Sequence, residues 1–267
     1  MSILTDEIKA KIASTDFTFH KGQYQIRSGR LFARVTSVLN MIKFDDGTLE
    51  KWKQRMQVKS FSEAIDLQGT YKGLEVMRTF SSALEAPDAY TTGSANFGTH
   101  VHAWIEQYMN DGKFPPLPEK EEYADIRICL KSVQKFFMEN DLSPQTVEIV
   151  KPELFVYSDK YGYAGSADFV CIRGDKAYLF DWKTSNGYRI NYALQLAAYA
   201  KAIEELYGLH IYKGTCVVFS KDRVAYDAHV NDEKMINFYF ELFKACLVMH
   251  NFIKHQPIPD MEIAFKE

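Results

Sequence analysis

Residues 179–185, LFDWKTS, form the stretch on which the interpretation of this sequence depends. An apolar run that follows a turn is typical of a buried strand, and residues i and i+2 of a strand point to the same face. Asp181 and Lys183 are therefore expected on one face, with Phe180 and Trp182 on the other. An ion pair at a strand end contributes little by itself. Whether Asp181 and Lys183 have a function therefore depends on the residues around them.

Two further carboxylates are expected near this pair. Asp168 lies 13 positions before Asp181, in the preceding strand of an expected hairpin, and Glu153 lies at the start of an earlier strand. Carboxylates that gather at one corner of a sheet raise one another's pKa unless a cation holds them. Oxygen ligands with open positions for water suit Mg²⁺ or Mn²⁺. The pattern predicts a metal site that activates water and stabilises charge on a phosphate.

Lys183 has two possible roles beside such a site, and the sequence leaves both open. Its amine could orient or help to deprotonate the attacking water. It could instead neutralise the charge that develops on the phosphate in the transition state.

The composition and the order of elements predict an α/β fold. The chain has 267 residues, of which 46% are hydrophobic, so a sizeable core is expected. Helices are followed by three strands, a helix, two strands and a helix, which fits a central mixed sheet flanked by helices. Residues 1–92 are expected to form a mainly helical elaboration with a β-hairpin at residues 20–40, and residues 93–267 one compact core. Residues 90–98, YTTGSANFG, are expected to be a loop.

The sequence also indicates the kind of compartment. No window approaches the roughly 18 apolar residues of a membrane span, and the first residues lack a signal-peptide core. The four cysteines are far apart, without a C-x-x-C pair. They are expected to be buried thiols, not ligands of an iron–sulfur cluster. The cytoplasm or another reducing compartment is therefore expected, without a membrane partner.

The segment AGSAD, taken with FDWKTS, resembles the metal-ligand and lysine core of the PD-(D/E)XK nuclease superfamily. Asp168 takes the place of the first Asp, and Asp181-Trp182-Lys183 that of the (D/E)-X-K element. Ala167 stands where the family has proline. The resemblance implies a restriction-endonuclease-like core and a DNA nuclease that uses one or two Mg²⁺ or Mn²⁺ ions.

A helical segment upstream extends this resemblance. GTHVHAWIEQY is similar to the Gly-x-x-x-His helix of RecB-type nuclease domains and mitochondrial genome maintenance exonucleases. His102 matches the metal-ligand histidine, and His100 is the weaker candidate. The implied metal ligands are His102, Asp168, Asp181 and the Trp182 carbonyl. Many RecB-type relatives carry an iron–sulfur cluster held by four cysteines. The widely spaced cysteines of this sequence match no such pattern, so the branch of the family without the cluster fits better.

A helix after the lysine strand completes the implied site. Gln195 and Tyr199 match the Gln-x-x-x-Tyr pair of the family, and their i, i+4 spacing places both on one helical face. The resemblance implies that Gln195 hydrogen-bonds the catalytic lysine or a phosphate, and that Tyr199 touches the DNA backbone or the site. Arg189 lies just past the lysine strand, where a phosphate chain could pass.

Glu153 occupies a position at which the family often has Glu, and its role stays open. It is either a metal ligand, direct or through water, or a partner of Lys183. Glu106, one turn after His102, is better explained as a solvated helix residue. The resemblance covers about residues 93–220.

The first 60 residues suggest the substrate. They hold eleven Lys/Arg against six Asp/Glu. Phe44, Trp52 and Phe61 lie in the same N-terminal part, residues 1–92, which is a candidate DNA-binding arch. Charge alone is typical of a solvated face, but cations with aromatic rings suit sequence-tolerant single-strand binding. We expect an exonuclease that acts on single-stranded or end-containing DNA in replication, repair or recombination. The sequence does not identify a helicase or recombination protein as a partner. The alternatives are a structure-specific endonuclease of the same superfamily and a non-catalytic DNA-binding protein.

Overall fold

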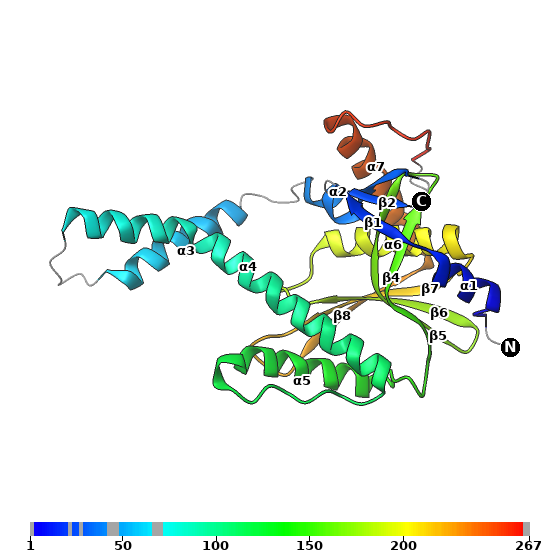
Figure 1. Ribbon diagram of the computed structural model, residues 1–267, viewed down its shortest axis with the longest axis horizontal. Helices are drawn as coiled ribbons and strands as arrows, with labels where there is room; N and C mark the ends of the chain where they lie inside the picture. The colour runs from blue at the N-terminus through cyan, green and yellow to red at the C-terminus, as the bar shows by residue number, and fades with distance from the viewer. Residues whose placement is uncertain (1–2, 21–22, 27–28, 42–47, 66–71, 264–267) are drawn as a thin grey trace. The chain divides into compact units, whose positions relative to one another are not determined.

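The computed structural model (Figure 1) describes residues 3–20, 23–26, 29–41, 48–65 and 72–263. The chain separates into two units. The larger unit comprises Met1–Lys43 and Val101–Glu267, and the smaller comprises Phe44–His100.

The larger unit is built on a mixed sheet, as the sequence predicted. Its central strand, β5 (Tyr163–Arg173), pairs antiparallel with β4 (Glu148–Ser158) on one side and with β6 (Lys176–Lys183) on the other. Beyond them β6 runs parallel to β7 (Ile211–Phe219), and β7 pairs antiparallel with β8 (Tyr226–Asp232). The sheet contains both antiparallel and parallel pairs because its connections differ. A tight turn joins β5 to β6 and makes them antiparallel, whereas a helix joins β6 to β7 and allows them to run parallel.

Two backbone features fix these connections. Gly174 has φ +66° in the turn between β5 and β6, a conformation that glycine adopts without steric cost. After β6 the chain forms α6 (Ile190–Tyr207), which ends at Gly208 with φ +69° and a hydrogen bond from its N–H to the Glu204 carbonyl. This is a left-handed helix cap.

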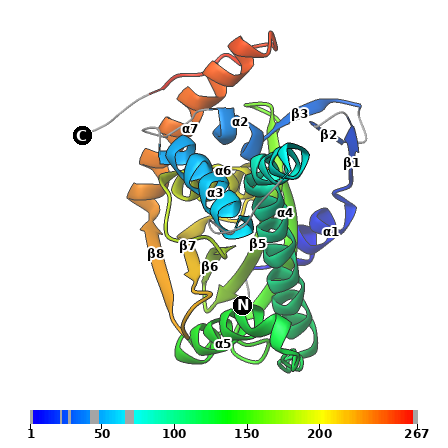
Figure 2. The same ribbon diagram turned by 90° about the vertical axis from the view of Figure 1, so that its left-hand side faces the viewer.

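Helices cover both faces of the sheet (Figures 1 and 2). One face packs against α6, with α7 (Glu233–Ile253) and α2 (Val35–Met41) beside it. The other packs against α5 (Ala124–Glu139), which follows the 3₁₀ turn Glu121–Tyr123. An aromatic cluster fills this second interface: Phe136, Phe137, Phe169, Phe180, Trp182 and Phe219. Each fully buried ring stabilises the fold by roughly 2 kcal/mol.

The N-terminal residues also belong to this sheet. After α1 (Asp6–Ser14) come β1 (Phe17–His20), β2 (Gln23–Ile26) and β3 (Leu31–Arg34). β3 pairs parallel with β5, and the described part of the chain thus forms an eight-stranded sheet. Residues 1–43 therefore cluster with the core, whereas the predicted division placed them in a separate elaboration of residues 1–92. The difference arises because the β3–β5 pairing is non-local and leaves no sequence signal.

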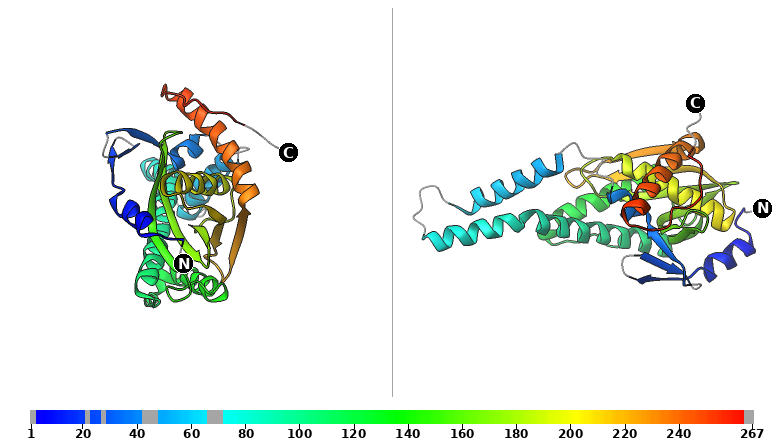
Figure 3. Two further views of the ribbon diagram at one scale, coloured as in Figure 1. Left: turned by 90° about the vertical axis from the view of Figure 1, so that its right-hand side faces the viewer. Right: turned by 90° about the horizontal axis from the view of Figure 1, so that it is seen from above.

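The smaller unit contains an antiparallel helical hairpin (Figure 3, right). α3 (Thr48–Ala64) packs against the first part of α4 (Gly73–Asp111), and Gln57 Nε2 donates to the Leu84 carbonyl. The predicted loop at residues 90–98 is wrong, because these residues are helical. The helix cost of Gly93 is only about 1 kcal/mol, and helical residues on both sides offset it. The predicted boundary at residue 92 thus falls inside α4.

Two general expectations can be compared with the structure. The four cysteines are free and buried, as predicted. None of the helices in the described ranges combines the length and the apolar character that a membrane crossing requires.

Candidate metal and catalytic site

The alternation predicted for LFDWKTS is present in β6. Lys183 Nζ lies 2.6 Å from Asp181 Oδ2 on one face. The rings of Phe180 and Trp182 stack on the other, with centroids 5.4 Å apart and planes 19° apart. Asp181 is 0% exposed and the Lys183 side chain 18% exposed. This is therefore a nearly buried ion pair, not a solvated one.

Asp168 and Glu153 lie opposite each other in the β4–β5 ladder, beyond its register shift between Ile149 and Lys151. The regular register continues in the pairs on either side, Pro152↔Phe169 and Leu154↔Ala167. Glu153 has φ +49°, which is uncommon for a residue other than glycine. Such backbone strain costs roughly 1–3 kcal/mol and gathers at functional sites. Ser166 Oγ donates a hydrogen bond of 2.9 Å to Glu153 Oε2 and steadies the strained residue.

The last turns of α4 bring His102 to these carboxylates. Its Nε2 lies 3.0 Å from the Trp182 carbonyl oxygen, and because a carbonyl only accepts, Nε2 carries the proton and donates. Nδ1 then faces Glu153 Oε1 at 3.7 Å and Asp168 Oδ1 at 3.8 Å. One imidazole nitrogen and two carboxylate oxygens thus point toward a common space.

These three residues fit a divalent cation. One ligand atom from each of His102, Glu153 and Asp168 lies within 4.8 Å of the other two. A histidine that binds metal through one nitrogen usually donates its other N–H to a carbonyl or carboxylate, as His102 does to Trp182. The donor set of nitrogen and hard oxygen suits Mn²⁺ or Mg²⁺.

The pKa values of Asp168 and His102 also favour a bound cation. Burial, together with repulsion from Asp181, raises the pKa of Asp168 to about 7. Burial lowers the pKa of His102, but Asp168 and Glu153 outweigh it and raise that pKa to about 9. Each group therefore binds a proton more readily than usual. A bound cation would supply the same compensating charge.

Trp182 supports the site through both of its backbone groups. Its amide N–H donates to Asp168 Oδ2 at 2.7 Å, and its carbonyl accepts from His102. The family resemblance implied that this carbonyl is a metal ligand. In the structure this carbonyl accepts the hydrogen bond that orients His102. Coordination of a metal ion through the second lone pair of the carbonyl oxygen stays a prediction.

The Gln-x-x-x-Tyr pair reaches Asp181 and neither Lys183 nor the surface. Gln195 Nε2 donates to Asp181 Oδ1 at 3.1 Å and to the Tyr199 hydroxyl oxygen at 3.2 Å. Gln195 is 9% and Tyr199 3% exposed. Tyr199 thus lies at the site, one of the two places expected for it, and contact of either residue with substrate stays a prediction. They position the carboxylate of Asp181.

The remaining predicted residue lies apart from this network. Arg189 is exposed at the N-cap of α6, and among the described residues none of the cluster contacts its side chain. Two supporting residues were not predicted. Ser166 lies in the AGSAD segment itself, and the Tyr192 ring lies 5.1 Å from Lys183 Nζ. Tyr192 precedes Gln195 by three residues, a spacing that could have indicated a shared helical face.

Gly165 gives this network room, and its replacement should disturb it. A Cβ at residue 165 would lie 2.5 Å from Tyr199 Cε1 and 2.9 Å from the hydroxyl oxygen. We expect Gly165→Ala to lower the free energy of unfolding by about 2 kcal/mol, a typical cost of overpacking. We also expect it to displace the hydroxyl that holds Gln195. Denaturant unfolding measures the first effect.

Gly214→Ala is the matched control in β7. A Cβ there would meet its nearest atom, Leu196 Cδ2, at 3.5 Å, an ordinary contact. The control should be neutral or stabilise the protein by up to about 1 kcal/mol, because alanine loses less backbone entropy than glycine. Equal stabilities for the two variants would show that the Tyr199 ring does not require glycine at residue 165.

Comparison with known proteins adds little to this geometry. No family model and no curated protein matches the chain. A solved structure, described as "Crystal structure of SSO0001", is 13% identical, with 96% of this chain and 87% of that chain covered and a TM-score of 0.33. A TM-score this low carries no argument about fold or activity.

Proposed function

We propose that this protein is a divalent-metal-dependent deoxyribonuclease that hydrolyses phosphodiester bonds. One observation carries the proposal. His102, Glu153 and Asp168 converge on one space, from α4, β4 and β5, and the ion pair of Asp181 and Lys183 lies on the adjoining strand. A histidine and carboxylates beside a buried lysine suit phosphoryl chemistry, in which charge on the phosphate must be neutralised.

The cation would be held by His102, Glu153 and Asp168, with Asp181 as a further candidate ligand. Mg²⁺ or Mn²⁺, as one ion or two, would supply Lewis-acid polarisation of a phosphoryl oxygen and lower the pKa of a coordinated water. Glu153 is the most exposed of the three ligand residues, with 45% of its side chain accessible. It is therefore the ligand best placed to adjust when a phosphate enters.

Lys183 is proposed to act as a cation toward the phosphate. Burial alone lowers its pKa, but Asp181 and Asp168 outweigh that effect and hold the pKa above the usual range of lysine. A lysine held in the protonated form is a poor general base and a good charge stabiliser. Of its two possible roles, the local charges favour neutralisation of the transition state. Asp181, held by Gln195, fixes where the amine lies.

The mode of attack is proposed from the family resemblance. PD-(D/E)XK relatives of the RecB type suggest an exonuclease that acts on single-stranded or end-containing DNA. Buried cysteine thiols and a nuclease activity both fit a reducing compartment, where the substrate would be met in replication, repair or recombination.

A comparison of linear and circular substrates tests the proposal. End-labelled linear single strands incubated with Mg²⁺ should be degraded, whereas a circular single strand of the same length should resist. Labels at the 5′ and 3′ ends should report the polarity through the order in which label is released. Product lengths resolved on denaturing gels provide the measurement.

Each contrary outcome selects a named alternative. Efficient cutting of the circle would replace the exonuclease with a structure-specific endonuclease. Absence of hydrolysis on every DNA and RNA form, with either Mg²⁺ or Mn²⁺, would leave a non-catalytic DNA-binding protein. Asp168→Asn should abolish the activity, so residual hydrolysis in that variant would indicate a contaminating nuclease.

A further inference from the structure

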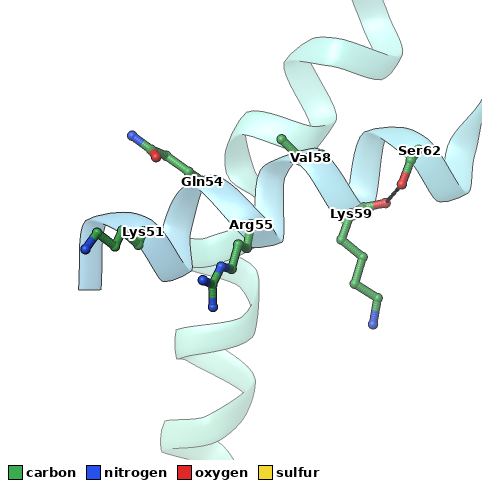
Figure 4. A pocket seen from close by; sticks show the side chains of 6 residues that line it. All are labelled: Lys51, Gln54, Arg55, Val58, Lys59 and Ser62. Atoms are coloured by element: carbon green, nitrogen blue, oxygen red, sulfur yellow. Dashed lines mark hydrogen bonds between the residues drawn. The ribbon is translucent and has the colours of Figure 1, made fainter. Parts of the chain in front are cut away.

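Helix α3 presents a face that stays exposed among the described residues of its own unit, 48–65 and 72–100. The residues of its inner face are half-buried: Lys53, Met56, Gln57, Ser60 and Phe61. Phe61 meets Phe80 of α4 edge-to-face, with ring centroids 5.8 Å apart. The residues of the opposite face are all exposed: Lys51, Gln54, Arg55, Val58, Lys59 and Ser62. These six, here called the outer face of α3, line an open depression of about 410 Å³ (Figure 4).

The outer face carries a row of cations. Lys51, Arg55 and Lys59 recur at every fourth residue, a spacing that aligns them along one side of a helix over about 12 Å. In Figure 4 Arg55 and Lys59 project to the same side of α3. No acidic residue occurs between Glu50 and Glu63, so the positive charge of the row is not interrupted.

These cations are poorly compensated. Among the side chains that the structure describes, none forms an ion pair with Lys51 or Arg55. Lys59 Nζ lies 3.7 Å from Glu63 Oε1, but the two side chains are 68% and 66% exposed. An exposed pair of this kind is weak and is readily exchanged for a stronger anion. The row is therefore available to a ligand with several negative charges.

The residues beside the row suggest which polyanion it accepts. Gln54, Val58 and Ser62 form a parallel row without charge, and Val58 is 68% exposed. A single strand offers both regularly spaced phosphates and unstacked bases, which an amide, a hydroxyl and an apolar side chain can contact. Duplex DNA keeps its bases inside the helix. One row of cations beside one uncharged row thus matches a single strand better than a duplex.

We infer that the outer face of α3 binds the phosphate backbone of single-stranded DNA. The inference rests on the proposed function only in its choice of DNA as the polyanion. It also revises the aromatic platform expected from the sequence. Phe61 packs inside the hairpin, Trp52 is half-buried, and Phe44 lies outside the described residues.

A charge-neutral triple variant tests this surface. Lys51→Gln, Arg55→Gln and Lys59→Gln together keep good helix formers in α3 and remove three cations. Binding of a fluorescent single strand, measured by anisotropy in EDTA over a series of salt concentrations, needs no catalysis. We expect affinity to fall about tenfold or more at low salt. The slope of log affinity against log salt should become about 2 units less negative, since each lost phosphate contact contributes about 0.7.

The matched control removes three exposed cations elsewhere. Lys120→Gln, Lys131→Gln and Lys135→Gln change the net charge equally, and Lys131 and Lys135 share the four-residue spacing on α5. This control should bind as the wild type does, and circular dichroism should show equal helix content in all three proteins. Equal losses in the two triple variants would overturn the inference, as would a wild type that binds duplex more tightly than single strand.

The experiment also separates this inference from the proposed function. Single-strand binding that depends on α3 in a protein without hydrolytic activity would refute the nuclease and retain the surface. Metal-dependent hydrolysis together with unchanged binding in the α3 variant would retain the nuclease and refute the surface.

Discussion

DNA hydrolysis should fall about 1,000-fold when Lys183 is replaced by methionine, while affinity for single-stranded DNA should change less than about twofold. Methionine keeps the length of the side chain but removes the cation that lies 2.6 Å from Asp181. A positioned charge of this kind contributes roughly 10²–10⁴ in rate because it acts on the transition state more than on the bound substrate. Single-turnover rates in Mg²⁺ and equilibrium binding in EDTA measure the two quantities.

The same replacement should also destabilise the fold. Asp181 is 0% exposed, so the loss of its partner leaves a buried charge with a hydrogen bond from Gln195 and no cation beside it in the described part of the chain. Breaking one side of a buried pair costs about 3 kcal/mol or more. In the double variant Asp181→Asn with Lys183→Met no charge is left unpaired. It should regain most of the free energy of unfolding and none of the activity.

A half-buried ion pair outside the site supplies the control. Lys201 Nζ lies 2.9 Å from Glu204 Oε2 on α6, with side chains 24% and 39% exposed. Lys201→Met should cost less than about 1 kcal/mol and leave hydrolysis unchanged. Activity of Lys183→Met within tenfold of the wild type would remove the lysine from the mechanism. A double variant no more stable than Lys183→Met would show that the buried pair is not the cause of the instability.

The sheet could be predicted from the sequence where its signals are local. The alternation in residues 179–185, the glycine turn at residue 174 and the apolar run of β5 all lie within a few residues of the structure they specify. The pairing of β3 with β5 joins residues 33 and 163, and no local pattern encodes it. It became visible only in the structure, which is why residues 1–43 were separated from the core.

The helix boundary failed for a related reason. Glycine and β-branched residues at 91–93 weaken a helix locally, and the prediction of a loop used only that information. Within the helix, the side chains of Thr99 and His100 bond to the carbonyls of Ala95 and Asn96. These hydrogen bonds, together with helix propagation from both sides, offset the helix-propensity cost of Gly93, which is about 1 kcal/mol.

The site was predicted in its residue types but not in its connections. The motifs implied His102, Asp168 and Asp181 as ligands and left the role of Glu153 open. The structure brings Glu153 within reach of His102 and Asp168, whereas Asp181 pairs with Lys183. Spacing could not reveal that Gln195 binds Asp181, since this depends on how α6 lies across the sheet. Nor could it reveal the positive φ of Glu153, a backbone conformation that the residue type does not indicate.

Replacement of Asp168 by asparagine should weaken Mn²⁺ binding by more than about 100-fold without unfolding the protein. Loss of a residue that only orients a ligand already costs 10–100-fold in affinity, and a direct ligand should cost more. Asparagine retains an oxygen to accept the 2.7 Å hydrogen bond from the Trp182 amide. It also removes a nearly buried charge that faces Asp181. The metal-free variant should therefore be at least as stable as the wild type.

Calorimetric titration and thermal unfolding with Mn²⁺ measure these effects. At about 100 times the dissociation constant, the ion should stabilise the wild type by about 2.7 kcal/mol, and the variant should show no shift. Glu106→Gln is the matched control, because it removes an exposed carboxylate one turn from His102 on the same helix. It should bind Mn²⁺ as the wild type does. If Asp168→Asn and Glu106→Gln bound Mn²⁺ equally well, the cluster of His102, Glu153 and Asp168 would not be a metal site. Asp168 supplies one of its three ligand atoms, so its loss must weaken binding at such a site.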